Sequence, residues 1–493
     1  MIARLAATID AAAVLARLGT TVGRITSDSR AIVPGDAFAA YPGETRDGRS
    51  FIPDALRRGA GSVLWEEAGY AWPAAWRLPN AGIANLRQEL GFIADQVYDH
   101  PSRQLWTIGV TGTNGKTSCA HWIAQALTAV GRTAALAGTL GNGMYGAVAP
   151  ALNTTPDAAA LHEMLRRCKD AGAQSVAMEV SSHGLMQGRV NGVKFDVALF
   201  TNLTRDHLDY HRTMDAYGAA KARLFDWPSL KAAVINAEDP FGRQLIDGCR
   251  RRGLAVLTYG QHMGDISTRN LGLSVNGAAA TVVTPWGEAE LSSGLVGSFN
   301  VSNLLGVLGV LLASAVPLDK AVAQLARFEP VAGRLQKLGG GGQPLVVVDY
   351  AHTPDALEQV LRALRPVAAS KSGRLVVVFG CGGDRDPGKR PQMGAIAGRL
   401  ADKVVVTSDN PRGEEPEAIL AQIVAGTLDS KARIERIAGR DAAIAGTIAE
   451  AGENDTVLIA GKGHETYQEI AGERHPFSDL DHARTALAAW RRP

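Results

Sequence analysis

The chain has 493 residues, more than one ordinary hydrophobic core holds, so it is expected to form two to four domains. Hydrophobic residues make up 46% and charged residues 20% of the sequence, which excludes a disordered protein. The formal net charge of +2 excludes a global field that would steer the protein to nucleic acid or to an anionic membrane, so any bound anion must be held by a local site.

Cysteine spacing and hydropathy both favour a cytoplasmic protein. The four cysteines lie apart, without C-x-x-C spacing, which argues against the disulfide framework of a secreted protein. Residues 1–19 carry Asp10 and Arg17 within their apolar pattern, which indicates an amphipathic helix and not a signal peptide. Residues 301–318 are the most membrane-like segment, but polar residues and Pro317 interrupt them and they are short for a bilayer. We interpret them as a buried core helix and expect no membrane span.

Residues 1–101 are expected to form a smaller domain of short apolar runs between polar, turn-rich stretches. A linker near residues 100–104 leads to a second region, residues 102–335, in which β-type runs alternate with helical patterns. The runs are 107–112, 175–180, 195–200, 232–236 and 255–260. This alternation predicts an α/β domain with a mostly parallel sheet and helices on both faces. Between residues 271 and 296 the pattern becomes strand–turn–strand, where we expect an antiparallel edge.

The third region, residues 336–493, repeats the alternation with the runs PLVVVDY, RLVVVFG, KVVVTSDN and TVLIAGKG. In both α/β regions the unusual polar residues come just after the runs, at the carboxyl ends of the expected strands. Open α/β sheets bind ligands at that edge. The sequence thus predicts a binding edge in each of the two domains, and the two edges can face each other across a cleft.

A glycine-rich turn follows the first strand of the second region, in TIGVTGTNGKTS (residues 107–118). Glycines let backbone N–H groups converge on phosphate oxygens, and a helix N-terminus favours negative charge. Lys116 is placed to reach the terminal phosphates, and the hydroxyl of Thr117 or Ser118 to approach Mg²⁺. The strict phosphate-loop pattern has glycine where this chain has Val110, and the alternative is a flexible strand-to-helix turn. The strand before and the helix after favour nucleotide binding.

Three further residues of this region can be interpreted in two ways. Glu179 ends the run SVAMEV and His207 lies in TNLTRDHLDYH, so both suit a Mg²⁺ site near a triphosphate. Equally, Glu179 suits a helix N-terminal charge and His207 a satisfied loop histidine, and spacing alone does not separate the two. Lys221, in YGAAKARLF, is on its pattern alone a solvated surface lysine.

Four polar loops follow the strands of the third region. Asp349 and His352 follow the first strand, residues 382–390 the second, residues 409–412 the third and residues 461–465 the fourth. Each loop alone is compatible with a capped turn. Four such loops at one sheet edge favour a binding site.

Together these motifs resemble the Mur ligase family over nearly the whole chain. The matching segments occur in the family's order: GTNGKT, MEVSSHG, TNLTRDHLDYH, FNVSN, the Gly-Arg of VAGRLQ, DYAHTPDAL, GGDRDPGKRP, DNPR and GKGHE. The resemblance implies an α/β protein of three domains. Residues 1–101 would bind the UDP-linked substrate, residues 102–335 would form a P-loop ATPase-type domain with a mostly parallel sheet, and residues 336–493 a Rossmann-like domain for the amino acid.

The resemblance also implies the site residues. The expected ATP contacts are Gly112, Thr113, Asn114, Gly115, Lys116, Thr117, Ser118, Asn300, Asn303, Arg334 and Asp349. The expected contacts to the UDP-linked substrate are Ser29, Glu44, Thr45, Arg46, Asn153, Thr154, Thr155, Ser181, Gln187 and Arg189. The expected amino-acid contacts are Arg390, Asp409, Asn410, Pro411, Arg412, Gly461 and Glu465. The expected catalytic residues are Lys116, Glu179, His207 and Lys221, and the expected metal ligands are Thr117, Glu179, His207 and Lys221, the last as a carbamate.

The activity that the resemblance implies is an ATP- and Mg²⁺-dependent ligation in peptidoglycan precursor synthesis, which serves cell shape and division. The D-glutamyl carboxylate of UDP-N-acetylmuramoyl-L-alanyl-D-glutamate becomes an acyl phosphate, which meso-2,6-diaminopimelate then attacks. Arg412 is expected to hold the distal carboxylate of that amine, Glu465 its distal ammonium, and Arg390 the carboxylate at the attacking end. We expect a cytoplasmic monomer without a nucleic-acid partner.

Several alternatives stay open at this stage. The lysine-adding relative, the tripeptide–dipeptide ligase relative and folylpolyglutamate synthase share the chemistry, and DNPR with GKGHE favours diaminopimelate. A regulatory P-loop protein would need neither a conditioned lysine nor an amino-acid pocket, and a sugar-nucleotide-binding module would not need the ATP loop. Phosphate release that depends on both acyl acceptor and amine separates these classes.

Overall fold

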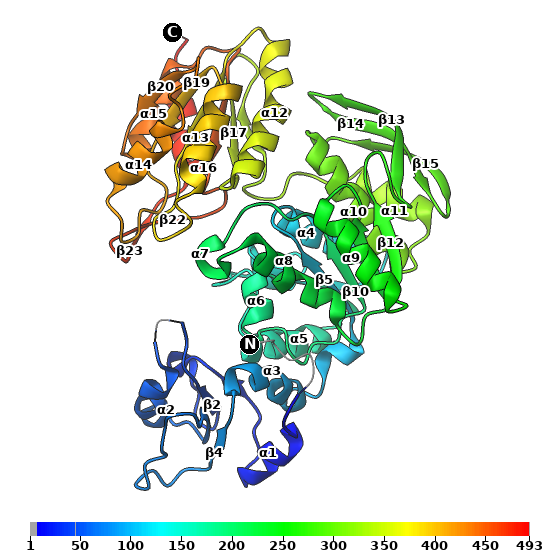
Figure 1. The fold of residues 1–493 in the computed structure, drawn as a ribbon, viewed down its shortest axis with the longest axis vertical. Helices are drawn as coiled ribbons and strands as arrows, with labels where there is room; N and C mark the ends of the chain where they lie inside the picture. Colours follow the sequence, from blue (N-terminus) through cyan, green and yellow to red (C-terminus); the bar gives the residue numbers. More distant parts are fainter. Residues whose placement is uncertain (1–6, 45, 493) are drawn as a thin grey trace.

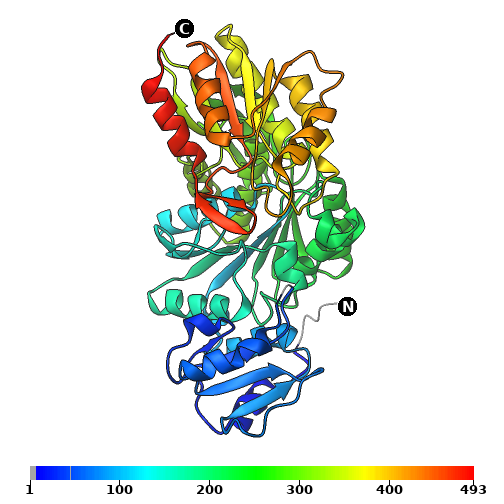
Figure 2. The ribbon, with the colours of Figure 1, turned by 90° about the vertical axis from the view of Figure 1, so that its left-hand side faces the viewer.

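The computed structural model describes residues 7–44 and 46–492. Three α/β domains follow one another along the long axis of the molecule, with the N-terminal domain at the bottom of Figure 1 and the C-terminal domain at the top. Figure 2 shows the same order from the side. Thr45, one of the expected substrate contacts, lies outside the described residues.

The N-terminal domain is built on a small parallel sheet in the order β1-β2-β3-β4. Its strands are Ile25–Thr26, Ala37–Ala40, Ser62–Glu66 and Asn80–Ile83, and its helices are α1 (Ala11–Arg17), α2 (Ile52–Arg57) and α3 (Leu86–Val97). Glu66, at the end of β3, accepts the N–H groups of Asn85 and Leu86 at 3.1 and 2.7 Å, so a carboxylate caps the positive end of α3.

The central domain contains an eight-stranded sheet in the order β12-β11-β10-β5-β9-β6-β7-β8. All of its expected strand runs form strands. The strands are β5 (Trp106–Thr111), β6 (Ala134–Gly138), β7 (Gly141–Met144), β8 (Ala147–Ala149), β9 (Ser175–Glu179), β10 (Val197–Phe200), β11 (Ala232–Asn236) and β12 (Ala255–Tyr259). Those from β12 to β6 in the sheet order are parallel, whereas β7 and β8 are antiparallel to their neighbours.

Helices cover both faces of this sheet. They are α4 (Lys116–Ala129), α5 (Ala158–Asp170), α6 (Ser182–Met186), α7 (Leu208–His211), α8 (Met214–Ala222), α9 (Pro240–Arg251), α10 (Ser298–Ala313) and α11 (Leu318–Leu325). The expected core helix is confirmed as α10, which is buried along most of its length and packs beside α4 against β10, β11 and β12. Gly309 allows this close approach, because a Cβ there would lie 2.7 Å from Val234.

The expected antiparallel edge at residues 271–296 is wrong in its placement. This segment contributes to a separate three-stranded sheet made of β13 (Ser267–Ser274), β14 (Gly277–Thr284) and β15 (Gly287–Ser293), against which α11 packs. A strand–turn–strand pattern fixes antiparallel neighbours but not the sheet they join. The antiparallel edge of the main sheet is instead the glycine-containing pair β7 and β8.

The C-terminal domain has a six-stranded sheet in the order β16-β17-β21-β18-β19-β20, parallel except for β16. Its strands are β16 (Gln336–Gly339), β17 (Leu345–Asp349), β18 (Leu375–Phe379), β19 (Lys403–Val406), β20 (Arg433–Arg436) and β21 (Thr456–Ala460), and β22 (Tyr467–Ile470) with β23 (Glu473–Pro476) forms a hairpin. The helices are α12 (Pro354–Ser370), α13 (Lys389–Leu400), α14 (Pro416–Ala425), α15 (Arg440–Glu450) and α16 (Asp479–Ala489). The four expected runs are β17, β18, β19 and β21, so the polar loops do leave one sheet edge.

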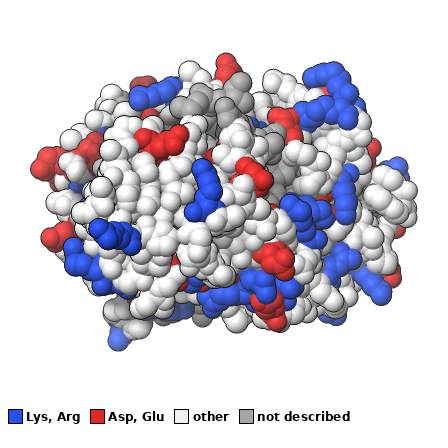
Figure 3. All heavy atoms as spheres, turned by 90° about the horizontal axis from the view of Figure 1, so that it is seen from below, with Lys and Arg blue, Asp and Glu red and all other residues white. Residues whose placement is uncertain are grey.

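The cysteines and the surface agree with the composition. All four cysteines are free and buried. Within residues 7–44 and 46–492, no helix combines the length and apolarity needed to cross a membrane. Figure 3 shows basic and acidic side chains interspersed over the face at the N-terminal end.

Arg440 and Asp479 form a fully buried ion pair under the ligand edge of the C-terminal sheet. Arg440 Nη2 lies 2.7 Å from Asp479 Oδ2, and the same guanidinium donates to the carbonyls of Ser408 and Ala460. Because Asp479→Asn would leave a buried charge uncompensated, we expect it to lower the free energy of unfolding by about 3–5 kcal/mol, measured by urea denaturation.

Asp481→Asn is the matched control, since Asp481 pairs with Arg484 at the exposed surface. Its expected effect is below about 1 kcal/mol. Equal stability of the two variants would contradict a stabilising role for the buried pair.

Candidate active site

The expected phosphate loop connects β5 to the first turn of α4. Gly115 has a φ of +86° and immediately precedes Lys116, the first residue of the helix. A Cβ at Gly115 would lie 2.4 Å from Asn303 Oδ1 on α10, and one at Gly112 would lie 1.9 Å from Thr201 Oγ1. Both positions therefore require glycine, and the backbone N–H groups at the start of α4 are directed toward the space where an anion would bind.

Two lysine side chains converge on one backbone oxygen of this loop. Lys116 Nζ donates to the carbonyl of Gly112 at 3.0 Å and to that of Thr113 at 2.8 Å, and Lys221 Nζ donates to Gly112 at 2.7 Å. Burial lowers the pKa of both lysines, and the charge of Lys116 lowers the pKa of Lys221 further.

The interpretation of Lys221 as a solvated surface residue is wrong. Its side chain is 1% exposed, and its ammonium lies 4.3 Å from the centre of the Tyr217 ring. The local pattern YGAAKARLF did not reveal this, because the loop that covers Lys221 comes from more than 100 residues earlier in the chain.

Glu179 lies at the end of β9, buried beside the phosphate loop, and does not begin a helix. Its carboxylate accepts hydrogen bonds from Thr117 Oγ1 at 2.8 Å and from the backbone N–H of Thr139 at 2.7 Å. Arg334 Nη2 donates to the same Thr117 hydroxyl at 3.2 Å. A hydroxyl and a carboxylate next to a phosphate loop provide the oxygen ligands that Mg²⁺ prefers.

His207 adopts a left-handed backbone conformation, and its ring packs against that of His183 with 4.8 Å between ring centroids. Burial lowers the pKa of His207 to about 3, so its imidazole is neutral near pH 7 and retains a lone pair for a metal. Among the described residues, no three His, Cys, Asp or Glu side chains gather into a metal-binding group by themselves. The expected metal set therefore fits only if Thr117 and a carbamate on Lys221 complete it.

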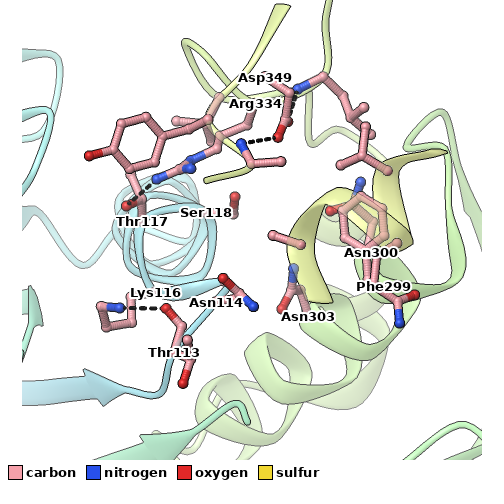
Figure 4. A pocket seen from close by; sticks show the side chains of 18 of the residues that line it. Thr113, Asn114, Lys116, Thr117, Ser118, Phe299, Asn300, Asn303, Arg334 and Asp349 are labelled. Carbon is pink, nitrogen blue, oxygen red and sulfur yellow. Dashed lines mark hydrogen bonds between the residues drawn. The ribbon is translucent and has the colours of Figure 1, made fainter. Parts of the chain in front are cut away.

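A cavity of about 260 Å³ opens between the central and C-terminal domains, at the phosphate loop. Figure 4 shows α4 and α10 on two sides of it, with Arg334 reaching Thr117 and Asp349 lying beyond. Every expected ATP contact except Gly112 lines this cavity, as do Glu179, His207 and Thr154, whereas Lys221 does not. The lining residues that sequence reasoning missed include Phe299, Tyr350, Asp355, Gln359 and Val360.

Contacts across this cavity hold the two domains together. Asn114 Nδ2 donates to Asp355 Oδ2 at 3.0 Å, and Arg205 forms a two-pronged ion pair with Asp386 at 2.8 and 3.1 Å. Arg334 stacks over the Tyr350 ring, with its guanidinium carbon 4.5 Å from the ring centre.

Several residues expected to hold the UDP-linked substrate form a network between the N-terminal and central domains. Gln187 Nε2 donates to Glu44 at 3.2 Å, and Arg189 donates to Gln187 at 2.9 Å and to the carbonyl of Thr155 at 2.8 Å. Thr155 Oγ1 in turn donates to the carbonyl of Glu179 at 2.9 Å and lies 3.0 Å from Ser181 Oγ. The network therefore leads from the N-terminal domain to the expected metal ligand.

The remaining expected substrate contacts lie around this network. Thr154 accepts a hydrogen bond from Thr139 at 3.1 Å. Ser29 is buried in a 3-10 turn of the N-terminal domain, whereas Arg46 and Asn153 are exposed. Arg87, which sequence reasoning missed, forms an ion pair with Glu44 at 2.7 Å.

The expected amino-acid contacts meet at the edge of the C-terminal sheet. Asn410 Nδ2 donates to Glu465 at 2.9 Å, while Lys462 Nζ donates to both Asn410 Oδ1 at 3.0 Å and Glu465 at 2.9 Å. Lys462, a fully buried residue that sequence reasoning missed, thus fixes the orientation of the amide and the carboxylate. Asp409 is buried beside them; burial opposes its ionisation, but the charges of Lys462 and Arg440 hold its pKa below the usual value.

The two arginines at this sheet edge, Arg412 and Arg390, differ in how exposed their side chains are. Arg412 has a 21% exposed side chain, donates to the carbonyl of Gly383 at 2.8 Å and lies 3.5 Å from Glu469. Arg390 is 1% exposed and paired with Glu414 through two hydrogen bonds of 2.8 Å each. In this structure the guanidinium of Arg390 is therefore paired with Glu414, whereas the resemblance led us to expect it to bind a substrate carboxylate.

The fold and this site define a three-domain α/β protein with the loop geometry of a nucleotide-phosphate site between its second and third domains. Residues 21–98 match the model of the Mur ligase family catalytic domain, residues 110–311 that of the Mur ligase middle domain, and residues 333–463 that of the Mur ligase glutamate ligase domain. The chain belongs to the Mur ligase family.

Individual relatives cover the chain almost completely. The chain is 53% identical to the UDP-N-acetylmuramoyl-L-alanyl-D-glutamate–2,6-diaminopimelate ligase of Chromobacterium violaceum, over 97% of each protein. It is 50% identical to the ligase of the same name from Pseudomonas aeruginosa, over 96% of each. A solved structure of a ligase with this name is 38% identical and covers 95% of both chains, with a TM-score of 0.66.

The requirement for glycine in the phosphate loop can be tested with two alanine variants. Gly115 and Gly131 have nearly the same φ, +86° and +88°, but a Cβ at Gly131 would meet no atom within 4 Å. Both variants carry the left-handed backbone cost of about 1–2 kcal/mol. Only Gly115→Ala forces its Cβ against Asn303, so we expect it to weaken ADP binding at least about tenfold, measured by titration calorimetry.

Gly131→Ala should bind ADP as the wild type does, because its extra methyl group points into open space at the far end of α4. Wild-type affinity in both variants would contradict nucleotide binding at this loop.

Proposed function

We propose that the chain is an ATP- and Mg²⁺-dependent ligase that joins meso-2,6-diaminopimelate to the D-glutamyl carboxylate of UDP-N-acetylmuramoyl-L-alanyl-D-glutamate. One observation carries the proposal: a row of residues, each hydrogen-bonded to the next, runs from Glu44 through Gln187, Arg189, Thr155, Glu179 and Thr117 to Arg334. It links the expected acyl-acceptor site, metal site and ATP site. The names of the relatives support the same substrates.

Each domain has a separate task in this proposal. Residues 1–101 bind the uridine nucleotide, residues 102–335 bind ATP and the muramoyl dipeptide, and residues 336–493 bind the amine. The reaction would take place in the cytoplasm, in a monomer, as a step of peptidoglycan precursor synthesis that supports cell shape and division.

The first chemical step transfers the γ-phosphate of ATP to the acceptor. A D-glutamyl carboxylate oxygen forms a bond to phosphorus while the bond to the ADP oxygen breaks, giving an acyl phosphate. The loop N–H groups, Lys116 and Arg334 offset the charge of the phosphates, and they are preorganised because the surrounding loop already holds them. Mg²⁺, held by Thr117, Glu179, His207 and carbamylated Lys221, would supply further charge stabilisation to the phosphates.

The second step joins the amine. The amino group attacks the acyl carbon, a tetrahedral intermediate forms, and phosphate leaves as the amine loses a proton. Since an acyl phosphate hydrolyses in water, the interdomain contacts of Arg205 and Asn114 have a function here, because they hold the two domains closed over the cavity.

Phosphate release measured with each substrate omitted in turn tests the proposal. We expect release only when ATP, the UDP-linked acceptor and meso-diaminopimelate are all present, and none in Lys116→Ala. Release that needs neither acceptor nor amine would instead favour a regulatory ATP-binding protein.

The amine preference depends on Arg412. Because its side chain is 21% exposed and lies near Glu469, L-lysine would not leave the guanidinium wholly unpaired. A charge-assisted hydrogen bond contributes about 1.5–3 kcal/mol. We therefore expect kcat/KM for diaminopimelate to exceed that for L-lysine about 10- to 150-fold, and Arg412→Ala to abolish most of this preference. Equal use of L-lysine by the wild type would refute this amine assignment.

The proposed carbamate on Lys221 gives a further prediction. The lowered pKa of this lysine provides a neutral amine, whose nitrogen can add to CO₂ and release a proton to give a carbamate. Lys221→Ala should lose ligation at least about a hundredfold, and a short carboxylic acid that fills the gap should restore part of it. Intact mass spectra of wild type kept in bicarbonate should show the added carboxyl group. Full activity of Lys221→Ala would rule out this role.

A further inference from the structure

Both terminal nitrogens of the Arg390 guanidinium are already hydrogen-bonded within the protein. Nη1 donates to Glu414 Oε2 at 2.8 Å and to Gln422 at 2.9 Å, and Nη2 donates to Glu414 Oε1 at 2.8 Å and to the carbonyl of Gly382 at 3.3 Å. Nε is buried without a partner among the described residues. These hydrogen bonds lower the pKa of the Glu414 carboxyl, so the pair stays ionised at neutral pH.

Glu414 also connects two loops that follow neighbouring strands. Its Oε1 accepts the backbone N–H of Asp384, in the loop after β18, at 2.6 Å. In return, the Asp384 carboxylate accepts the N–H of Gly413, in the loop after β19, at 3.0 Å. The N–H of Gly383 donates to the carbonyl of Asn410 at 2.9 Å. The two loops are therefore joined by several hydrogen bonds, of which Asp384 takes part in two and Glu414 in one.

Arg412 lies where these two loops meet. Its guanidinium donates to the carbonyl of Gly383, and a Cβ at Gly382 would lie 2.7 Å from Arg412 Nη1. Its backbone is left-handed, with a φ of +52°, which costs about 1–2 kcal/mol and persists only where the surroundings impose it. The direction of the Arg412 side chain thus depends on the path of both loops.

We propose that Glu414 is a positioning residue for the amine: through its ion pair with Arg390 it fixes the two loops and so aims Arg412 at the distal carboxylate. This inference rests on the proposed function and adds to it a residue that sequence reasoning did not select. In this proposal Arg390 also acts on the amine through Glu414 and the two loops.

The test compares Glu414→Gln, which keeps the shape but removes the charge, with Arg390→Lys, which keeps the charge but loses the two-pronged geometry. KM for each of the three substrates, the ratio of kcat/KM for diaminopimelate to that for L-lysine, and the thermal midpoint are measured. We expect KM for diaminopimelate to rise about tenfold or more in both variants, with KM for ATP and for the UDP-linked acceptor unchanged. The amine preference should fall in parallel.

Two comparisons make the result specific. Glu415→Gln is the matched control, because Glu415 is the exposed neighbour at the start of α14 and its side chain does not cap the helix. It should behave as the wild type. The double variant of Arg390→Lys and Glu414→Gln should be no worse than either single variant, since both remove the same ion pair.

The contrary outcomes are distinct. Equal losses for all three substrates with a lower thermal midpoint would overturn the proposal in favour of a merely structural pair. A lower KM for diaminopimelate in Glu414→Gln would overturn it by showing that Glu414 competes with the amine for Arg390. If the wild type itself failed to release phosphate with diaminopimelate, the proposed function would fail first, before any variant was compared.

Discussion

Two lysine side-chain nitrogens share the carbonyl oxygen of Gly112, and the rest of the site is arranged around this contact. Lys116 and Lys221 both donate to it, at 3.0 and 2.7 Å, in a buried environment where like charges repel strongly. Such a pair is stabilised when one lysine is neutral or when an anion arrives between the positive groups. The loop therefore favours a bound anion, and it favours the uncharged form of Lys221.

The neighbouring acid, Glu179, is held in place by hydrogen bonds from two threonines. Glu179 has two hydrogen-bonded contacts, to Thr117 and Thr139, that fix its carboxylate next to the loop without neutralising it. The hydroxyl of Thr117 also accepts a hydrogen bond from Arg334 at the domain boundary. A movement of Arg334 would therefore change a contact of the phosphate loop. Nucleotide binding and domain position are thus coupled through groups that are already in contact.

The local sequence pattern predicted most of the strands. In the third region, for example, the four apolar runs form β17, β18, β19 and β21. It also placed the phosphate loop, because glycine spacing and a helix start are local features. It failed where partners come from distant segments: the burial of Lys221 depends on Gly112, and the sheet joined by residues 267–293 depends on packing against α11. Arg390, which the family resemblance assigned to the amine, is paired with Glu414 in this structure, and its contact with the amine stays a prediction. The resemblance to the Mur ligase family supplied the expected role of Lys221, which the residues alone did not indicate.

The position of β21 has a consequence for the order in which the protein becomes active during synthesis. This strand, residues 456–460, lies between β17 and β18 in the C-terminal sheet, although it is the last of the six in the chain. Until it leaves the ribosome, β17 and β18 have no common neighbour, and the Gly461 loop that completes the amine edge does not exist. The phosphate loop, more than 300 residues earlier, can fold well before then. The nascent chain can therefore form its phosphate loop early, but the C-terminal side of the cavity and the loop at Gly461 only at the end, so an incomplete chain cannot carry the reaction through.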